Sequence, residues 1–447
     1  MIFWADRPQT IAVIPDAFIF LTSGMNLALS LGWYYNSVSS HFQFAWFVGI
    51  IIGALLSAGL TQILIKRYFV LLSSFLVVVA GILYTACPYE STVLLVARYL
   101  NGIGTGLITV PFIVHCSEIS ATAKRGFTLG LEQLCVALGI FIQVTYIALW
   151  DINNSVSPTR VHGIFCLGFG LGALGLAYLV IESPVYYVRQ ANDAKALNSL
   201  TCLQLPTILT EEKKLLLQVH KDFVTMNEYI GRGDSFINGL GPLLRMIFYR
   251  GLLAFTFSLP YSMQLYFSTA MGVSNDSQWT SPFYAAIRIL GVLAAISMFD
   301  IIGRKLIGLI GLLVMGGLGI GIAVIFAYME NWVQENPMRL ACVLLLVFQL
   351  FAGLYAPTTT VYLGEAFPMI VKPYFVALCV CVECTVHIVV ICTFTFNLHE
   401  IYVFNTFTYA LVFACFLLFL FTIPETKLTT LNDAQERFRA WIHIKFM

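Results

Sequence analysis

The chain has 447 residues, of which 59% are hydrophobic and only 11% are charged, and its formal net charge is +1. An average soluble domain has roughly a quarter of its residues charged, so this composition excludes a water-soluble globular fold. The near-neutral charge, together with the lack of a basic stripe interleaved with aromatic residues, excludes nucleic acid as a partner. The sequence therefore predicts an integral membrane protein whose surface contacts membrane lipid.

Apolar runs close to the roughly 20 residues that cross a bilayer recur along the whole chain. Such unbroken runs are typical of helices rather than of the alternating strands of a β-barrel. Charged and turn residues bound the first six runs, which predict spans at residues 11–33, 42–64, 68–86, 92–115, 127–149 and 161–181. Residues 1–181 are thus expected to form an N-terminal bundle of six helices.

A long polar stretch separates this bundle from a second one. Residues 182–246 predict a cytoplasmic linker with short surface helices, and residues 423–447 predict a cytoplasmic tail. The second bundle, at 247–422, is predicted from runs at 247–271, 281–299, 306–328, 339–362, 374–397 and 402–422. The predicted fold class is an all-α polytopic membrane protein, with twelve transmembrane helices in two six-helix bundles.

The positions of Lys and Arg predict the orientation, because short cytoplasmic loops are enriched in both. The basic loop residues fall on the side of the linker, and they are Lys66, Arg67, Lys124, Arg125, Arg304, Lys305 and Lys372. Both termini are therefore expected in the cytoplasm, and the cell membrane is the expected location. N-x-S sequons at Asn153 and Asn275 fall in loops that this topology places outside, where glycosylation is expected.

Motifs recur at corresponding places in the two halves. Gly53 precedes Lys66-Arg67 in the first half, and Asp300-Ile-Ile-Gly303-Arg304-Lys305 stands at the equivalent place in the second. Further motifs follow in chain order: Gly102, Gly104 and Gly106, Ser117-Glu118, Arg125-Gly126, Gln133-Leu134, Glu182-Ser183-Pro184, Tyr266-Phe267-Ser268, Gly364-Glu365-Ala-Phe367-Pro368 and Pro424-Glu425-Thr426-Lys427. The ordered set resembles the sugar-transporter branch of the major facilitator superfamily, as a divergent member similar to facilitated glucose and trehalose transporters. The resemblance implies two bundles that rock about a central site.

The resemblance also implies a gate of charged residues at the cytoplasmic helix ends. Its members here are Glu118, Arg125, Glu182, Asp300, Arg304 and Glu365. Carboxylates and guanidinium groups at such places can pair across helix ends and hold the inward side shut, while solvated loop charge is the alternative. The gate departs from the family pattern, since Gln62 and Ile63 stand where an aspartate and an arginine are expected, and Val185 replaces an arginine.

The implied solute site keeps one family residue and changes the others. Gln133 retains an amide that can donate to and accept from a hydroxyl, with helix packing as its alternative role. Thr256, Phe257 and Ser262 stand where the resemblance expects amides, and Thr360 stands where it expects a tryptophan. Tyr266, in the matching motif Tyr266-Phe267-Ser268, is a further candidate solute residue. A site that has lost several amides should accept a solute other than glucose.

Arg288 and Glu383 stand where the family has sugar-binding asparagines. A charge at the bilayer centre costs on the order of 2.5 to 3.5 kcal/mol on insertion scales, so both are expected to face the central cavity. They could pair with each other, whereas an unpaired Arg288 would favour an anionic solute. A structural tie between helices, or an Arg288 that reaches an interface, is the alternative.

The sequence predicts a secondary transporter of a small polar, sugar-like solute, with no cofactor. A carrier of an organic anion that uses Arg288 and a non-transporting solute sensor are the alternatives. An enzyme is not expected, since no nucleophile, base and orienting group occur together. Proton coupling stays open, with Asp16 as a candidate carboxylate. No metal site is expected, because thiols in apolar runs usually pack, although one grouping places three thiols beside an imidazole: Cys379, Cys381, Cys384 and His387.

Overall fold

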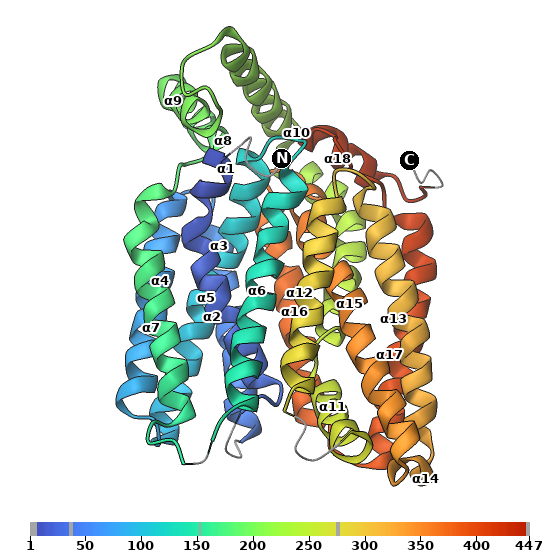
Figure 1. Ribbon diagram of the computed structural model, residues 1–447. Helices are drawn as coiled ribbons and strands as arrows, with labels where there is room; N and C mark the ends of the chain where they lie inside the picture. Colours follow the sequence, from blue (N-terminus) through green and yellow to red (C-terminus); the bar gives the residue numbers. More distant parts are fainter. Residues whose placement is uncertain (1–6, 35–38, 152, 274–277, 444–447) are drawn as a thin grey trace.

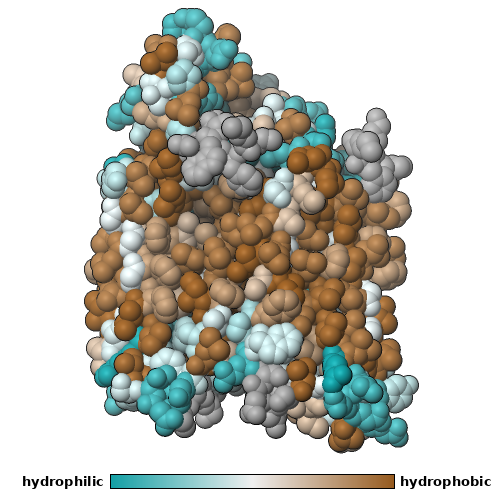
Figure 2. Space-filling model, viewed as in Figure 1, coloured by the Kyte–Doolittle hydropathy of each residue, from teal (hydrophilic) through white to brown (hydrophobic). Residues whose placement is uncertain are grey.

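The computed structural model describes residues 7–34, 39–151, 153–273 and 278–443, and its regular elements are all helices. Two bundles of long helices stand side by side, and the linker helices α8 (Pro184–Arg189) and α9 (Asp193–Leu203) project from one end (Figure 1). The first helix, α1 (Arg7–Ala12), and the last, α18 (Leu431–Arg439), lie at this same linker end. On the face shown in Figure 2, apolar side chains form a band across both bundles and polar ones gather at the two ends.

The first bundle contains six spans. The first span is α1 followed by α2 (Ile14–Ser30), because Pro15 in the first turn of α2 cannot continue a helix from α1. The other five are α3 (Ser40–Leu60), α4 (Lys66–Ala86), α5 (Ser91–Ile119), α6 (Arg125–Ala148) and α7 (Pro158–Leu176), which ends in the 3₁₀ turn η1 (Ala177–Leu179).

The seventh span is divided. Helix α10 (Glu211–Gly251) bends at Gly231, whose φ of 72° is not helical, so its first part belongs to the linker and its second part leads into the second bundle. The turn η2 (Leu252–Phe255) then interrupts the span before α11 (Leu259–Gly272), which has Pro260 in its first turn. The second bundle therefore starts before the predicted residue 247, and its first span is not one continuous helix.

The rest of the second bundle is α12 (Thr280–Met298), α13 (Arg304–Ala327), the short α14 (Met329–Trp332), α15 (Glu335–Glu365), α16 (Lys372–Thr393) and α17 (Leu398–Thr422). Among the described residues, eleven helices are long and apolar enough to cross a membrane, and α2, with 17 residues, completes the set of twelve spans. The predicted all-α fold of twelve spans in two six-helix bundles is confirmed.

Glycines allow close contact between α3 and α5. A Cβ on Gly53 would collide with the backbone oxygen of Ile103, and a Cβ on Gly106 would collide with that of Ile50. Helices in membranes associate by such close packing of small residues. Glycines of both α3 and α5 therefore allow these two helices of the first bundle to lie close together.

The two halves repeat a capping contact at the linker end. The carboxylate of Glu182, after α7, accepts a hydrogen bond from the backbone N–H of Lys66 (2.6 Å) at the start of α4. The carboxylate of Glu425, after α17, accepts from the backbone N–H groups of Arg304 (3.1 Å) and Lys305 (2.9 Å) at the start of α13. A carboxylate at a helix N-terminus satisfies free N–H groups and interacts favourably with the helix dipole. Each bundle thus fixes its third helix by a carboxylate that follows its sixth.

We predict that Gly303→Ala lowers the free energy of unfolding by about 1 to 3 kcal/mol, as is usual for a strained backbone conformation. Gly303 has a φ of 110°, and a Cβ there would meet the carboxylate of Glu425. Thermal unfolding of the purified protein measures the effect. Gly59→Ala is the matched control, since its Cβ would meet nothing within 4 Å, and an equal fall in both variants would contradict the explanation.

Candidate functional site

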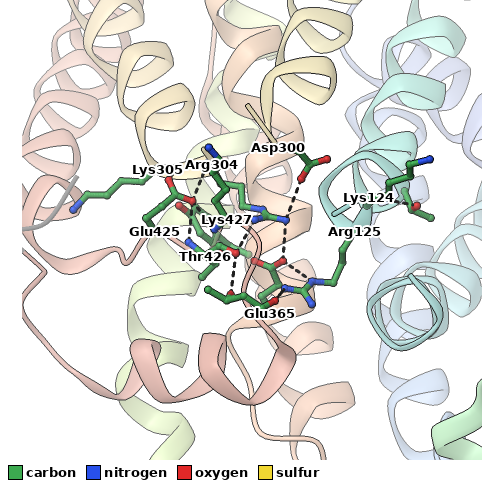
Figure 3. A network of polar contacts seen from close by, with 12 residues as sticks. Lys124, Arg125, Asp300, Arg304, Lys305, Glu365, Glu425, Thr426 and Lys427 are labelled. Carbon is green, nitrogen blue, oxygen red and sulfur yellow. Dashed lines mark hydrogen bonds and ion pairs between the residues drawn. The ribbon is translucent and has the colours of Figure 1, made fainter. Parts of the chain in front are cut away.

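A buried network of charges joins the two halves at the linker end (Figure 3). Arg125, at the start of α6, donates from Nε to the Glu365 carboxylate at the end of α15 at 2.6 Å, and both side chains are almost fully buried. Arg304 lies 3.4 Å from the same carboxylate oxygen and 3.8 Å from the carboxylate of Asp300. We call Arg125, Asp300, Arg304 and Glu365 the rim network. Because α6 and α15 belong to different bundles, the rim network joins the two bundles at the linker end.

Backbone groups of the tail complete the rim network. Arg125 donates to the carbonyl of Thr429 (2.8 Å), and Arg304 donates to the carbonyl of Thr426 (2.7 Å). Burial raises the pKa of the Asp300 carboxyl, and the neighbouring Arg304 opposes this only in part. Glu365, with two guanidinium groups beside it, is therefore the main anionic partner of the network.

Two polar contacts join the halves beside the rim network. Gln62, which stands where the family has a charge, donates to the carbonyl of Ile370 at 2.6 Å. Lys372, at the start of α16, donates to the hydroxyl of Ser117 on α5 at 2.6 Å. Gln62 thus still connects the halves through a neutral hydrogen bond.

The other two candidate gate residues lie apart from the rim network. Glu182 pairs with Lys66 (3.3 Å) inside the first bundle, and Glu118 has no ion pair within 4 Å in the described part of the chain. The expected gate therefore reduces to four residues that meet, while Glu182 acts as the cap of α4.

A cavity of about 60 Å³ lies between the two bundles. Its polar lining comes from both halves, with Thr105, Thr109, Glu132 and Gln133 from the first and Arg250, Thr256, Arg288 and Glu383 from the second. Aromatic rings complete the lining, from Phe20, Trp46, Phe47 and Phe257. This volume holds a few water molecules, whereas pockets for drug-sized ligands occupy roughly 300 to 1,000 Å³.

Arg250 is the centre of a second buried network beside this cavity. It donates from Nη2 to Glu132 (3.0 Å) and from Nε to Glu383 (2.6 Å). It also donates from Nη1 to the hydroxyls of Thr359 (2.9 Å) and Thr360 (3.0 Å), and Thr360 donates to Glu132 (2.6 Å). We call these five residues the central network. Only Glu132 belongs to the first half, so its bonds join the halves near the middle of the molecule.

Arg288 and Glu383 both line the cavity, but they do not pair with each other. Arg288 donates to the carbonyl (3.3 Å) and hydroxyl (3.1 Å) of Thr256 and to the amide oxygen of Gln349 (3.1 Å). The pairing expected as one alternative is absent because Arg250 occupies the carboxylate of Glu383. Uncharged acceptors hold Arg288 in its place.

The sequence analysis missed Glu132 and Arg250. Glu132 is adjacent to Gln133 inside an apolar span, and Arg250 directly precedes the apolar part of the seventh span. Because an ionisable residue within a span usually marks a pathway, the same rule that singled out Arg288 could have found both. The charged linker before Arg250 makes it look like an interfacial residue.

The remaining candidate solute residues lie in different places in the structure. Gln133, Thr256 and Phe257 line the cavity, and Thr360 belongs to the central network. Ser262 is buried, and its hydroxyl donates to the carbonyl of Ser258.

Tyr266 is 75% exposed, so the expectation that it touches the solute is wrong. The extended backbone at Ser258, just before α11, interrupts the helical period, and Tyr266 falls on the outer face of α11.

Other candidate residues are placed as follows. Asn153 is exposed in the connection between α6 and α7, at the end opposite the linker helices (Figure 1), and Asn275 lies outside the described residues. Asp16, the candidate coupling carboxylate, is buried in α2.

His387, which the sequence places near three thiols, stacks on Phe47, with ring centroids 4.5 Å apart. The described residues include no group of three or more potential metal ligands.

Comparisons with known proteins agree with this architecture. Residues 22–438 match the family described as "Sugar (and other) transporter". "Hexose transporter 1" of Plasmodium yoelii yoelii is 24% identical over 419 residues, which cover 85% of this chain and 79% of that protein. "Major facilitator superfamily transporter mfsA" of Aspergillus fumigatus is 24% identical over 352 residues, and the match covers 72% of this chain but only 61% of that protein's length.

A solved structure shares the fold. The proton:xylose symporter XylE bound to 6-bromo-6-deoxy-D-glucose superimposes with a TM-score of 0.79 at 18% identity, covering 97% of this chain and 99% of that one. The family match extends over most of the chain, from within α2 to within α18, and includes the linker. The chain therefore belongs to the sugar (and other) transporter family of the major facilitator superfamily, as a divergent member.

Proposed function

We propose that this chain carries a neutral polyhydroxyl solute of sugar size through the central cavity by alternating access. The observation that supports this most is the cavity itself, which lies between the two halves and takes hydrogen-bonding side chains from both. A solute bound there contacts both bundles, so its binding can be linked to their relative movement.

The two halves meet on both sides of the cavity. On the linker side they are joined by the rim and central networks. On the far side, a Cβ on Gly32 would lie 3.3 Å from Leu259, and the rings of Trp33 and Tyr284 are 6.4 Å apart. This closed arrangement fits an intermediate between the states that open to either side.

The charges around the cavity favour an uncharged solute. Glu132 and Glu383 are offset by Arg250 and Arg288, so a neutral solute adds no unbalanced charge to a buried site. Gln133 and Thr256 provide an amide and a hydroxyl that can bond to solute hydroxyls. The names of the similar transporters, which mention hexose and xylose, agree with this class.

Uptake into vesicles containing the purified protein tests the proposal. Labelled pentoses, hexoses and polyols should exchange against the same unlabelled solute, and organic anions should not. Accumulation driven by a proton gradient would identify symport, whereas equilibration alone would identify uniport. If no sugar or polyol exchanges, the proposed function is wrong.

We predict that Gln133→Ala reduces the initial rate of uptake about tenfold, as expected for the loss of roughly 1.4 kcal/mol of binding. Gln133 lines the cavity, while the exposed Tyr266 does not. Tyr266→Ala should therefore leave the rate unchanged at the same protein level. Equal rates for Gln133→Ala and the unmodified protein would exclude Gln133 as a solute ligand.

We predict that Glu365→Ala lowers stability by about 3 to 5 kcal/mol, because it leaves buried guanidinium groups of the rim network without their main anionic partner. Thermal unfolding of the purified protein measures the loss. Glu335→Ala is the control, since Glu335 pairs with Arg339 on the exposed surface. Exposed helical pairs of this kind contribute about 0.3 to 0.5 kcal/mol, so the two variants should differ clearly.

We further propose that the linker end faces the cytoplasm, which agrees with the basic residues gathered there. Protease added outside intact cells should leave the connection between α9 and α10 uncut, and should cleave it after permeabilisation. Asn153→Gln should abolish any glycan carried in the α6–α7 connection. Cleavage of the linker in intact cells would reverse the orientation.

A further inference from the structure

The rim and central networks are two layers between the same pair of helices. On α6, Glu132 lies seven residues after Arg125, and on α15, Thr360 lies five residues before Glu365. At about 1.5 Å per helical residue, the central network is roughly 8 to 10 Å deeper in the molecule than the rim network. Opening toward the linker side must therefore separate two layers in succession.

The two layers have opposite polarity. In the rim network the first half contributes Arg125 and the second half Glu365, whereas in the central network the first half contributes Glu132 and the second half Arg250. In the described residues, both ion pairs that join the halves lie on the linker side of the cavity. Among the described residues of the far side, Trp33 and Tyr284 bring the halves together by ring packing. The described contacts between the halves thus include ion pairs on the linker side and packing on the far side.

Glu132 occupies a special position, since it is both a lining residue of the cavity and the first half's only member of the central network. Its side chain is 4% exposed. Its Oε1 accepts from Arg250 (3.0 Å) and, at 3.4 Å, from the amide of the neighbouring Gln133, and its Oε2 accepts from Thr360 (2.6 Å). Removing Arg250 and Thr360 without replacement would leave this buried carboxylate with only the long bond from Gln133, which is costly.

We propose that Glu132 is a latch that responds to the solute. This inference rests on the proposed function. Two adjacent hydroxyl groups of a bound solute donate to the two oxygens of Glu132 and replace Arg250 and Thr360, which frees the central network to separate. A solute with a single hydroxyl cannot replace both donors, so the latch selects vicinal diols such as sugars and polyols.

Glu383 explains how Arg250 can leave Glu132. Arg250 keeps its 2.6 Å bond to Glu383, and it keeps Thr359, when Glu132 moves away with the first half. The guanidinium therefore stays neutralised inside the second half. Glu383 and Glu132 bind the same side chain, but only Glu132 connects the halves.

This difference provides a matched pair of variants, Glu132→Gln and Glu383→Gln. Hydrogen–deuterium exchange of the full-length protein in lipid nanodiscs, without solute, reports on opening at each end. Glu132→Gln should raise the exchange rate several-fold in the linker-end segments around Ser117 to Arg125 and Glu365 to Lys372. Glu383→Gln should leave these segments as protected as in the unmodified protein, because the bonds between the halves remain.

The inference is overturned if Glu132→Gln stays as protected as the unmodified protein, or if Glu383→Gln opens the linker end to the same extent. Should Glu132→Gln not fold, Glu132→Asp keeps the charge but shortens the side chain, and the same several-fold rise is expected from it. Xylose or sorbitol should open the unmodified protein, whereas 1-propanol should not, and an equal response to 1-propanol would also overturn the latch. The exchange rates of the Glu132 and Glu383 variants are measured without solute. They therefore test the role of Glu132 even if the uptake experiment finds no transported sugar or polyol.

Discussion

Pairing of buried charge between the two bundles is the constraint on which this structure depends. Removing an ion from water is costly, so a carboxylate or guanidinium inside a membrane protein usually pairs with an opposite charge or with hydrogen-bonding groups. In this chain the partners are divided between the halves: Arg125 and Glu132 on α6 meet Glu365 and Arg250 of the second bundle. The contact between the bundles at the linker end therefore satisfies buried charges of both halves, and separating the bundles there would require new partners for these charges.

Buried carboxylates also fix the helix ends, where they accept hydrogen bonds from free backbone N–H groups. Glu182 and Glu425 each follow the sixth span of their own bundle and cap the third span, so the internal repeat is maintained by equivalent carboxylates. Glu425 also places the tail, whose backbone carbonyls accept from Arg125 and Arg304. The tail, the Glu425 cap and the rim network are thus one connected structure, whereas the Glu182 cap lies inside the first bundle.

The central cavity is lined by charged side chains at positions where the resemblance expects amides. Where the resemblance expects amides, this chain has Arg288 and Glu383, and it adds Glu132 and Arg250 beside them. The four charges balance, and neutral acceptors on Thr256 and Gln349 hold Arg288 without a counter-ion.

The sequence alone determined the membrane class, the twelve spans, the repeat and the family, because apolar length and ordered motifs are local properties of the chain. It also identified Arg125, Arg304 and Glu365, since their motifs carry fixed spacings. Only the tertiary structure decided which charges meet. Arg250, rather than Arg288, pairs with Glu383, and the break before α11 places Tyr266 on the exposed face of that helix. Both outcomes depend on helix rotation and on distances between spans far apart in sequence, which no local pattern encodes.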